Sequence, residues 1–545
     1  MAFGGYGSLR VLVVDDFNNF RIAVIKMLEE FGCTRVDSAM NGKTAIKLCD
    51  EHAYDLVLCD YNLGQAKNGQ QVLEELRHKD LLKRESLFVM VSAESGVSTV
   101  LSAYDYSPDA YLTKPITGNT LRKRLDRLLM QRQEMLPVFQ ELNNDNIDAA
   151  IDTARRAING GSRYATTYQK LLGELFLKNG DLDAAEEVYK QVLEVRALDW
   201  AQVGMSSVKL HKGELDTGIN WLKKIVNENP YCMQAYDMLA EAYGSKNDLE
   251  AKQKILESAV GVSPKSILRQ TSLAETAEAN NDLPVAAKAY SRSVRLGTHS
   301  CHDQLSNHMQ LGRVSVKLFD EHDANASDIS REALRTLENA GKHFALDNQI
   351  QLQAQMLECQ LLHNRGEKLQ ASKLYEEVQE KLDLLGDNLE LDSELDLVST
   401  YRQLDMKDRA DQLLKQLLDK YKNDEAALVK IDRLLEEPVS ELNRQKVARL
   451  NKEGIGHYKN KDYNASIECF VRARRLFPNH IGVHLNLVQA LTSEMKEFGI
   501  HEEQMDLCLG VLKKVESRIT TNHTQFSRYR QLQDMVRVLG REAHA

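Results

Sequence analysis

The chain has 545 residues, which is too long for one hydrophobic core, so we expect several domains. Charged residues make up 28% of the sequence and hydrophobic residues 43%, a balance that excludes an intrinsically disordered chain. The formal net charge of −10 argues against direct DNA binding, which needs a basic face. No apolar stretch has the length of a membrane span, so we expect no membrane insertion.

The cysteines and the N-terminus indicate the compartment. The eight cysteines form no Cys-x-x-Cys pair, as is typical of reduced thiols inside a cell. The first residues contain neither a basic segment nor an apolar segment of the kind found in a signal peptide. We therefore expect a cytoplasmic protein.

After a flexible N-terminus over residues 1–8, residues 9–130 alternate short apolar runs with helical patterns. This alternation predicts an α/β doubly wound domain with a five-stranded parallel sheet. Helices are expected over 17–31, 44–51 and 70–77. The predicted strands are 10–14, 35–39, 56–59, 86–91 and 109–113.

Polar side chains stand where the predicted strands end. Asp15 and Asp16 follow the first strand, Asp60 follows the third, Ser92 the fourth and Lys114 the fifth. Ligands of an open α/β sheet gather at the carboxyl edge of its strands, so we expect these side chains to lie together. Three carboxylates in one small site are costly without a hard divalent cation, so the sequence predicts Mg²⁺ there.

The set also predicts a chemistry. A carboxylate that attacks a phosphoryl group needs the incoming negative charge neutralised, and a metal ion together with Lys114 would do so. The hydroxyl of Ser92 would add a hydrogen bond to the phosphoryl oxygens. A single aspartate at a strand end is commonly a turn or helix-capping residue, so the prediction rests on the whole set.

Residues 9–130, with these motifs in this order, resemble the receiver domain of two-component response regulators. The resemblance implies that Asp60 accepts a phosphoryl group from a sensor histidine kinase. It implies that Asp15, Asp16, Asp60 and the backbone carbonyl of Asn62 hold Mg²⁺. The sequence departs from the family after Asp60, where Leu63-Gly64 replaces the usual Met-Pro turn.

The resemblance also assigns roles to the remaining site residues. Ser92 and Lys114 would contact the phosphoryl group, and Ser92 would move on activation together with the aromatic switch residue Tyr111. Asn62 and Glu94 fall at the positions that tune dephosphorylation in the family. The alternative is that they are two solvated loop residues.

The rest of the sequence is helical and self-similar. A turn followed by a second helix recurs at steps of 33 or 34 residues, with Ala185, Gly218, Lys252 and Ala286 at equivalent positions. Small residues such as Ala185 permit close helix packing, and a large residue four positions later, such as Tyr189, fills the gap between hairpins. This segment resembles tetratricopeptide repeats, which hold a protein partner in a concave groove.

The repeat pattern divides the chain after residue 130. A basic amphipathic segment over 121–130 runs on without a flexible linker, so we expect a stiff helical junction. The predicted segments are a helical junction or degenerate repeat over 131–165, a first repeat block over 166–300, an irregular helical spacer over 301–350, degenerate repeats over 351–424, and a C-terminal repeat with capping helices over 425–545.

Two weaker signals stay open. Cys301 and His302, with His299 and His308 nearby, have metal-capable side chains, but their spacing matches no zinc pattern, and an ordinary helix start is favoured. The basic cluster over 472–475 fits either an acidic partner or a solvated helix face.

These observations predict a response regulator whose phosphorylation controls protein binding by the repeats. They predict no enzyme activity beyond phosphorylation from a donor and slow self-dephosphorylation. One alternative is an adaptor that binds a kinase or another regulator and modulates its phosphotransfer. Another is a constitutive scaffold with a passive receiver. A transcription factor is disfavoured by the acidic balance. The sequence names neither the kinase nor the partner.

Overall fold

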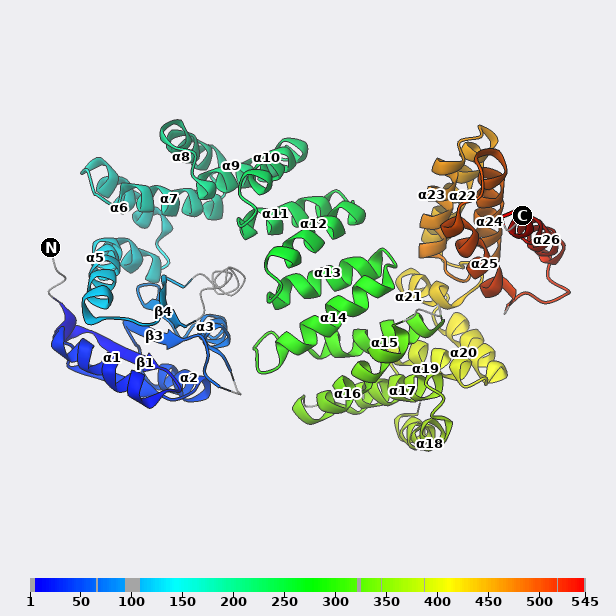
Figure 1. The fold of residues 1–545 in the computed structure, drawn as a ribbon, viewed down its shortest axis with the longest axis horizontal. Helices are drawn as coiled ribbons and strands as arrows, with labels where there is room; N and C mark the ends of the chain where they lie inside the picture. Colours follow the sequence, from blue (N-terminus) through cyan, green and yellow to red (C-terminus); the bar gives the residue numbers. More distant parts are fainter. Residues whose placement is uncertain are drawn as a thin grey trace. The chain divides into compact units, whose positions relative to one another are not determined.

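The computed structural model describes residues 5–64, 67–93, 108–320, 325–344, 346–386, 388–516 and 518–543. The chain divides into two compact units, Met1–Val314 and Ser315–Ala545. Figure 1 shows an α/β domain at the start of the first unit and helical hairpins in the rest of the chain. Each unit is described by itself.

The α/β domain contains one five-stranded parallel sheet. Its strands are β1 (Arg10–Val14), β2 (Arg35–Ala39), β3 (Leu56–Asp60), β4 (Leu87–Ser92) and β5 (Ala110–Thr113), in the order β2-β1-β3-β4-β5. Val14 pairs with Cys59, and Asp60 pairs with Val91. The carboxyl ends of neighbouring strands therefore lie side by side, and the predicted fold class is confirmed.

Helices cover both faces of this sheet. They are α1 (Asn18–Glu30), α2 (Gly42–Glu51), α3 (Gly69–His78) and α5 (Gly118–Asn143). One face of the sheet forms a core with α2 and α3, in which Leu12 and Val57 are buried with Leu73. On the other face, Val13 is buried with Leu125 and its neighbours. Alternate strand residues point to opposite faces, so continuous apolar runs supply both cores.

Helix α5 belongs to both the α/β domain and the repeats. Its first half, including Leu125, packs on the sheet, and its second half, including Val138 and Phe139, packs with the helices that follow. Pro137 lies inside this continuous helix. The guanidinium of Arg132 donates hydrogen bonds to the Asp109 carboxylate and to the carbonyl of residue 84.

The first unit continues as antiparallel helical hairpins. Aspartates cap several second helices: Asp181, Asp248 and Asp282 each accept a hydrogen bond from a backbone N–H three residues later. This capping explains why an aspartate precedes each of these three helices. The helices are α6 (Ile147–Asn159), α7 (Ala165–Asn179), α8 (Leu182–Val195), α9 (Asp199–His211), α10 (Leu215–Glu228), α11 (Met233–Ser245), α12 (Leu249–Val262), α13 (Ile267–Ala279) and α14 (Leu283–Gly297), and α15 (Leu305–Asp320) begins in this unit.

Aromatic side chains lock neighbouring hairpins together. A methyl group at Gly173 or Gly204 would lie 2.5 Å or 2.3 Å from the ring of Tyr189, so both helices need glycine to admit this ring. In the second unit, Gly454 has the same relation to Phe470, at 2.7 Å. The fit of large rings against glycines of neighbouring helices explains the large residue of the repeat, represented by Tyr189.

The second unit is also built of packed helices. The helices are α16 (Ala326–His343), α17 (Asn348–Asn364), α18 (Lys368–Leu385), α19 (Leu391–Gln403), α20 (Lys407–Lys420), α21 (Glu425–Ile431), α22 (Glu441–Lys459), α23 (Tyr463–Leu476), α24 (Ile481–Phe498), α25 (Glu502–Glu516) and α26 (Phe526–Ala543). One of its cores, around Leu487 and Leu491 of α24, also takes side chains from α25 and α26. The domain boundaries within 131–545 stay predictions.

Candidate functional site

Three carboxylates meet at the carboxyl edge of the sheet. Asp15 and Asp60 are almost fully buried, at 1% and 6% exposure, whereas Asp16 is exposed. Each of the three offers an oxygen atom, and these atoms lie within 4.8 Å of one another. An all-oxygen set of this charge fits a hard cation such as Mg²⁺. The sheet order, which places β1 beside β3, brings these residues together.

Lys114 lies against two of these carboxylates. Its Nζ is 2.7 Å from Oδ2 of Asp15 and 3.1 Å from Oδ2 of Asp60. The ring of Phe20 is 4.2 Å from the same ammonium group, and the Lys114–Pro115 peptide bond is cis. The ammonium group is therefore held beside the carboxylate that the sequence predicts as the phosphoacceptor.

The buried charges shift one another's pKa values. Burial raises the pKa of Asp60, and Asp15 adds to this effect, while the ion pair with Lys114 opposes it. For Lys114, burial acts to lower the pKa, but the contacts with Asp15 and Asp60 outweigh it and raise the pKa. Lys114 therefore stays charged. One ammonium group beside three carboxylates leaves the site with an excess of negative charge, which a divalent cation would offset.

The structure places the other predicted residues as follows. Ser92 is buried at the end of β4, next to β5, and Tyr111 is half-buried in β5. Asn62 is exposed and follows Asp60 by two residues. Glu94 lies outside the described residues. The roles of these residues in binding or releasing a phosphoryl group stay predictions.

Gly69 is a site residue that the sequence did not single out. It is the first residue of α3, and its N–H donates to the carbonyl of Tyr61 at 2.8 Å. A methyl group on Gly69 would lie 2.1 Å from the backbone oxygen of Asp60. Because the loop after β3 returns this closely to the strand end, only glycine fits. The Asn68-Gly69 pair was visible in the sequence, but the close approach to Asp60 was not.

The second metal-capable cluster contains a residue from the α/β domain. Glu74 of α3 lies with Cys301 and His302, and their ligand-type atoms are within 4.8 Å of one another. The Glu74 carboxylate accepts hydrogen bonds from Gln70 and from Ser300. Contacts within the chain therefore already satisfy both oxygens of this buried carboxylate.

Comparison with known proteins agrees with this geometry. The family profile described as the response regulator receiver domain matches residues 11–126, and the tetratricopeptide repeat profile matches residues 171–197 and 234–266. Residues 11–126 are a receiver domain, and tetratricopeptide repeats follow it. Among the described residues, no helix is both long enough and apolar enough to cross a membrane.

The receiver is similar to chemotaxis proteins. It is 28% identical over 121 residues to chemotaxis protein CheY-3 of Vibrio cholerae, which covers 22% of this chain and 92% of that protein. It is 26% identical over 120 residues to chemotaxis protein CheY of Pseudomonas aeruginosa, covering 22% and 95% of the two chains. The solved structure of Vibrio cholerae chemotaxis protein CheY4 is 25% identical, covers 22% of this chain and 98% of that one, and has a TM-score of 0.21.

Proposed function

We propose that this chain is a response regulator that accepts a phosphoryl group on Asp60 from a sensor histidine kinase and thereby controls protein binding by its repeats. The observation that carries the proposal is the geometry at the sheet edge. The carboxylate of Asp60 is buried and paired with Lys114, and it shares its site with Asp15 and Asp16. The match to the receiver-domain profile over residues 11–126 supports the proposal.

In the proposed reaction, a carboxylate oxygen of Asp60 forms a bond to phosphorus while the bond from phosphorus to the donor's leaving atom breaks. Asp15, Asp16 and the carbonyl of Asn62 would hold Mg²⁺, which supplies neutralising charge when it is bound. Lys114 would then pair with a phosphoryl oxygen, since its ammonium already lies 3.1 Å from Asp60. The Ser92 hydroxyl would donate a hydrogen bond to another oxygen. Water would later release the phosphoryl group.

The proposed output is protein binding. Stacked tetratricopeptide hairpins present an extended surface suited to a peptide or a folded partner. The repeat match at 171–197 and 234–266 supports this role, and the partner is an unidentified protein. Nothing in the described residues favours DNA as the ligand, because the net charge of the chain is −10.

The test compares three proteins: the wild type, Asp60→Asn, and the control Asp50→Asn, which changes an exposed aspartate of α2. Each is treated with acetyl phosphate and Mg²⁺, measured by intact mass, and used to capture partners from a lysate. We expect a phosphoryl adduct on the wild type and on the control, absent from Asp60→Asn, with a matching change in captured proteins. An adduct with an unchanged captured set would favour the scaffold with a passive receiver. The absence of any adduct would overturn the proposal.

A further inference from the structure

One side of α3 is buried although it is polar. Gln70, Gln71, Glu74 and Glu75 are 5%, 9%, 2% and 8% exposed. The apolar side of this helix already packs on the sheet through residues such as Leu73. An amphipathic helix at the edge of an isolated receiver would turn its glutamines and glutamates to water. Another part of the chain must therefore cover this face.

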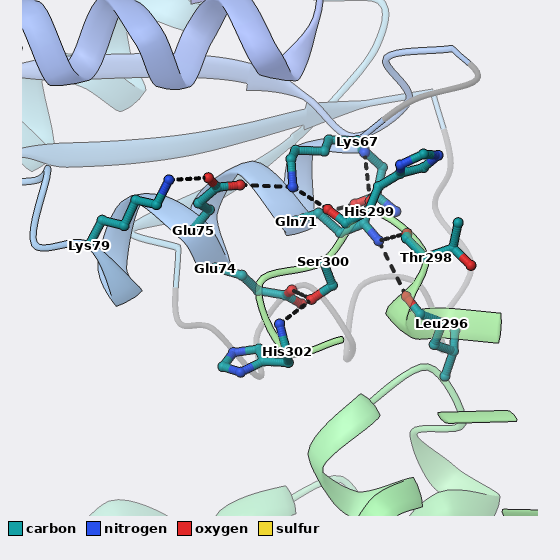
Figure 2. A network of polar contacts seen from close by, with 11 residues as sticks. Lys67, Gln71, Glu74, Glu75, Lys79, Leu296, Thr298, His299, Ser300 and His302 are labelled. Carbon is teal, nitrogen blue, oxygen red and sulfur yellow. Dashed lines mark hydrogen bonds and ion pairs between the residues drawn. The ribbon is translucent and has the colours of Figure 1, made fainter. Parts of the chain in front are cut away.

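The last residues of α14 and the turn that follows, residues 296–303, cover it and are called the 296–303 turn (Figure 2). The side-chain amide of Gln71 donates to the carbonyls of Leu296, at 3.3 Å, and Thr298, at 3.0 Å. Ser300 Oγ donates to Oε2 of Glu74 at 2.8 Å, and Lys67 donates to the carbonyl of His299. These pairs are 225 to 232 residues apart in the sequence. We name them together the docking contact.

Charge compensation of Glu75 by lysines on either side of α3 supports the docking contact. The carboxylate of Glu75 lies between Lys67, at 2.8 Å, and Lys79, at 2.6 Å (Figure 2). Burial acts to raise the pKa of Glu75, but the two lysines outweigh it and lower the pKa. Glu75 therefore stays charged and orients Lys67 toward the turn. Buried polar groups with matched partners make such a contact specific in geometry.

Contacts of Tyr61 and Gly69 connect Asp60 to the repeats and to the docking contact. Tyr61, which follows Asp60, has its hydroxyl 3.5 Å from Nζ of Lys265, and this ammonium lies 5.5 Å from the centre of the tyrosine ring. Lys265 lies between α12 and α13 of the repeats. The start of α3 is fixed to the end of β3 by the hydrogen bond from Gly69 to Tyr61 and by the close approach of Gly69 to Asp60. A movement of Asp60 is therefore passed to Lys265 through Tyr61 and to α3 through Gly69.

We propose that the docking contact is a switch set by the state of Asp60: it is closed in the unphosphorylated chain and is released when Asp60 is phosphorylated. This inference rests on the proposed function. In the closed state, Lys114 holds the Asp60 carboxylate directly. A phosphoryl group on Asp60 pairs with that ammonium and adds negative charge at the end of β3, so the end of β3 and the start of α3 shift and carry Lys67 and Gln71 away from their carbonyl partners.

Release would change the repeats themselves. The receiver is joined to the first repeat block through the continuous helix α5 and again, farther along the block, through the docking contact and the Tyr61–Lys265 contact. Because a stack of hairpins is held only by nearest-neighbour contacts, its curvature depends on whether its far end is restrained. Opening the contact frees the 296–303 turn and the polar face of α3, and it lets the block change shape.

Hydrogen exchange of the full chain with and without beryllofluoride and Mg²⁺ tests the switch. We expect backbone amides of α3 and of residues 296–303 to exchange at least about 5-fold faster in the beryllofluoride form, in line with ordinary coupling between sites. The Asp60→Asn variant should show no change. Unchanged or slower exchange in a wild type that binds beryllofluoride by fluorine NMR and separately gains a phosphoryl group from acetyl phosphate by mass would overturn the switch and leave the proposed function standing. A wild type that takes up no phosphoryl group would overturn both.

Variants on the repeat side give a second, independent measurement. Ser300→Ala removes the hydrogen bond to Glu74, and Lys265→Ala removes the contact with Tyr61. Neither residue belongs to the phosphorylation site. Since coupling is reciprocal, both variants should bind beryllofluoride about 5-fold more tightly or better than wild type, measured by fluorine NMR titration. The matched control is Ser258→Ala, an exposed serine of α12. Affinities of both variants equal to that of the control would overturn the coupling.

Discussion

Replacing Gly69 by alanine tests how closely the phosphorylation site is built into the fold. The added methyl group would lie 2.1 Å from the backbone oxygen of Asp60 and 3.0 Å from Sδ of Met90. Non-bonded carbon and oxygen atoms need about 3 Å or more, so the strand end and the helix start must separate by about 1 Å. No rotamer change can relieve the clash, because the oxygen belongs to the backbone.

The expected cost follows from this geometry. Overpacking in a well-packed core costs about 1–3 kcal/mol, and a clash with backbone belongs at the upper end of that range. Alanine recovers less than about 1 kcal/mol through its better helix propensity, because Gly69 is only the first residue of α3. We therefore expect Gly69→Ala to destabilise the receiver by about 2–3 kcal/mol and to weaken beryllofluoride binding.

Gly118→Ala is a matched control, since Gly118 is also the first residue of a helix, α5, after a capping residue. Its added methyl group would lie 3.7 Å from the nearest atom, Cγ of Met27, which is ordinary contact. The control should be neutral or stabilising by up to about 1 kcal/mol. The free energies come from hydrogen exchange of β1 and β3 amides at increasing urea concentration. Equal stabilities of the two variants would refute the close approach of Gly69 to Asp60.

Three further predictions concern the repeats. Gly204→Ala should destabilise the first unit by about 1–3 kcal/mol in urea unfolding, because its methyl group would lie 2.3 Å from the Tyr189 ring. The control Gly261→Ala has open space around the added methyl group and should be neutral or stabilising by up to about 1 kcal/mol. Burial, with nearby cations, lowers the pKa of His484 to about 3, so as pH falls below 6.5 the unfolded chain binds a proton before the folded chain does. The free energy of unfolding of the second unit should therefore fall by about 2–3 kcal/mol between pH 6.5 and 4.5. His484→Asn should flatten this loss, measured by hydrogen exchange in α24. Burial, with Glu338 and Glu377, raises the pKa of Glu358 to about 7, so the free energy of unfolding should fall as pH rises from 4.5 to 7. Glu358→Gln should be more stable than wild type at pH 8 by up to about 3 kcal/mol, measured by hydrogen exchange in α17.

Much of the receiver was predictable because its signals are local. The strands β1, β3 and β4 are apolar runs buried almost throughout, and each run ends at a polar residue: Asp15, Asp60 or Ser92. The parallel order follows from helices of ordinary length between strands. The sequence therefore predicted the sheet, the acidic cluster and the neighbouring lysine. The repeat period was equally local, since it comes from capping aspartates and from rings such as Tyr189 against helix glycines.

What could not be predicted depends on residues far apart in the chain. No local pattern in the sequence indicates that the polar face of α3 is buried, because only the fold places the 296–303 turn against it. For the same reason, Cys301 and His302 were considered without Glu74, which lies beside them in space. Gly69 has an ordinary place at a helix start, and its closeness to Asp60 depends on how the loop after β3 returns.

The most direct test of the account is to locate the phosphoryl group on the chain. The wild-type protein is treated with acetyl phosphate and Mg²⁺, reduced with borohydride, which converts an aspartyl phosphate into homoserine, and sequenced as peptides by mass spectrometry. The account predicts homoserine at residue 60. It also predicts a much smaller amount of homoserine when Lys114 is replaced by alanine, because that ammonium lies 3.1 Å from the Asp60 carboxylate. Homoserine at another aspartate, or none, with residue 60 unchanged, would contradict it.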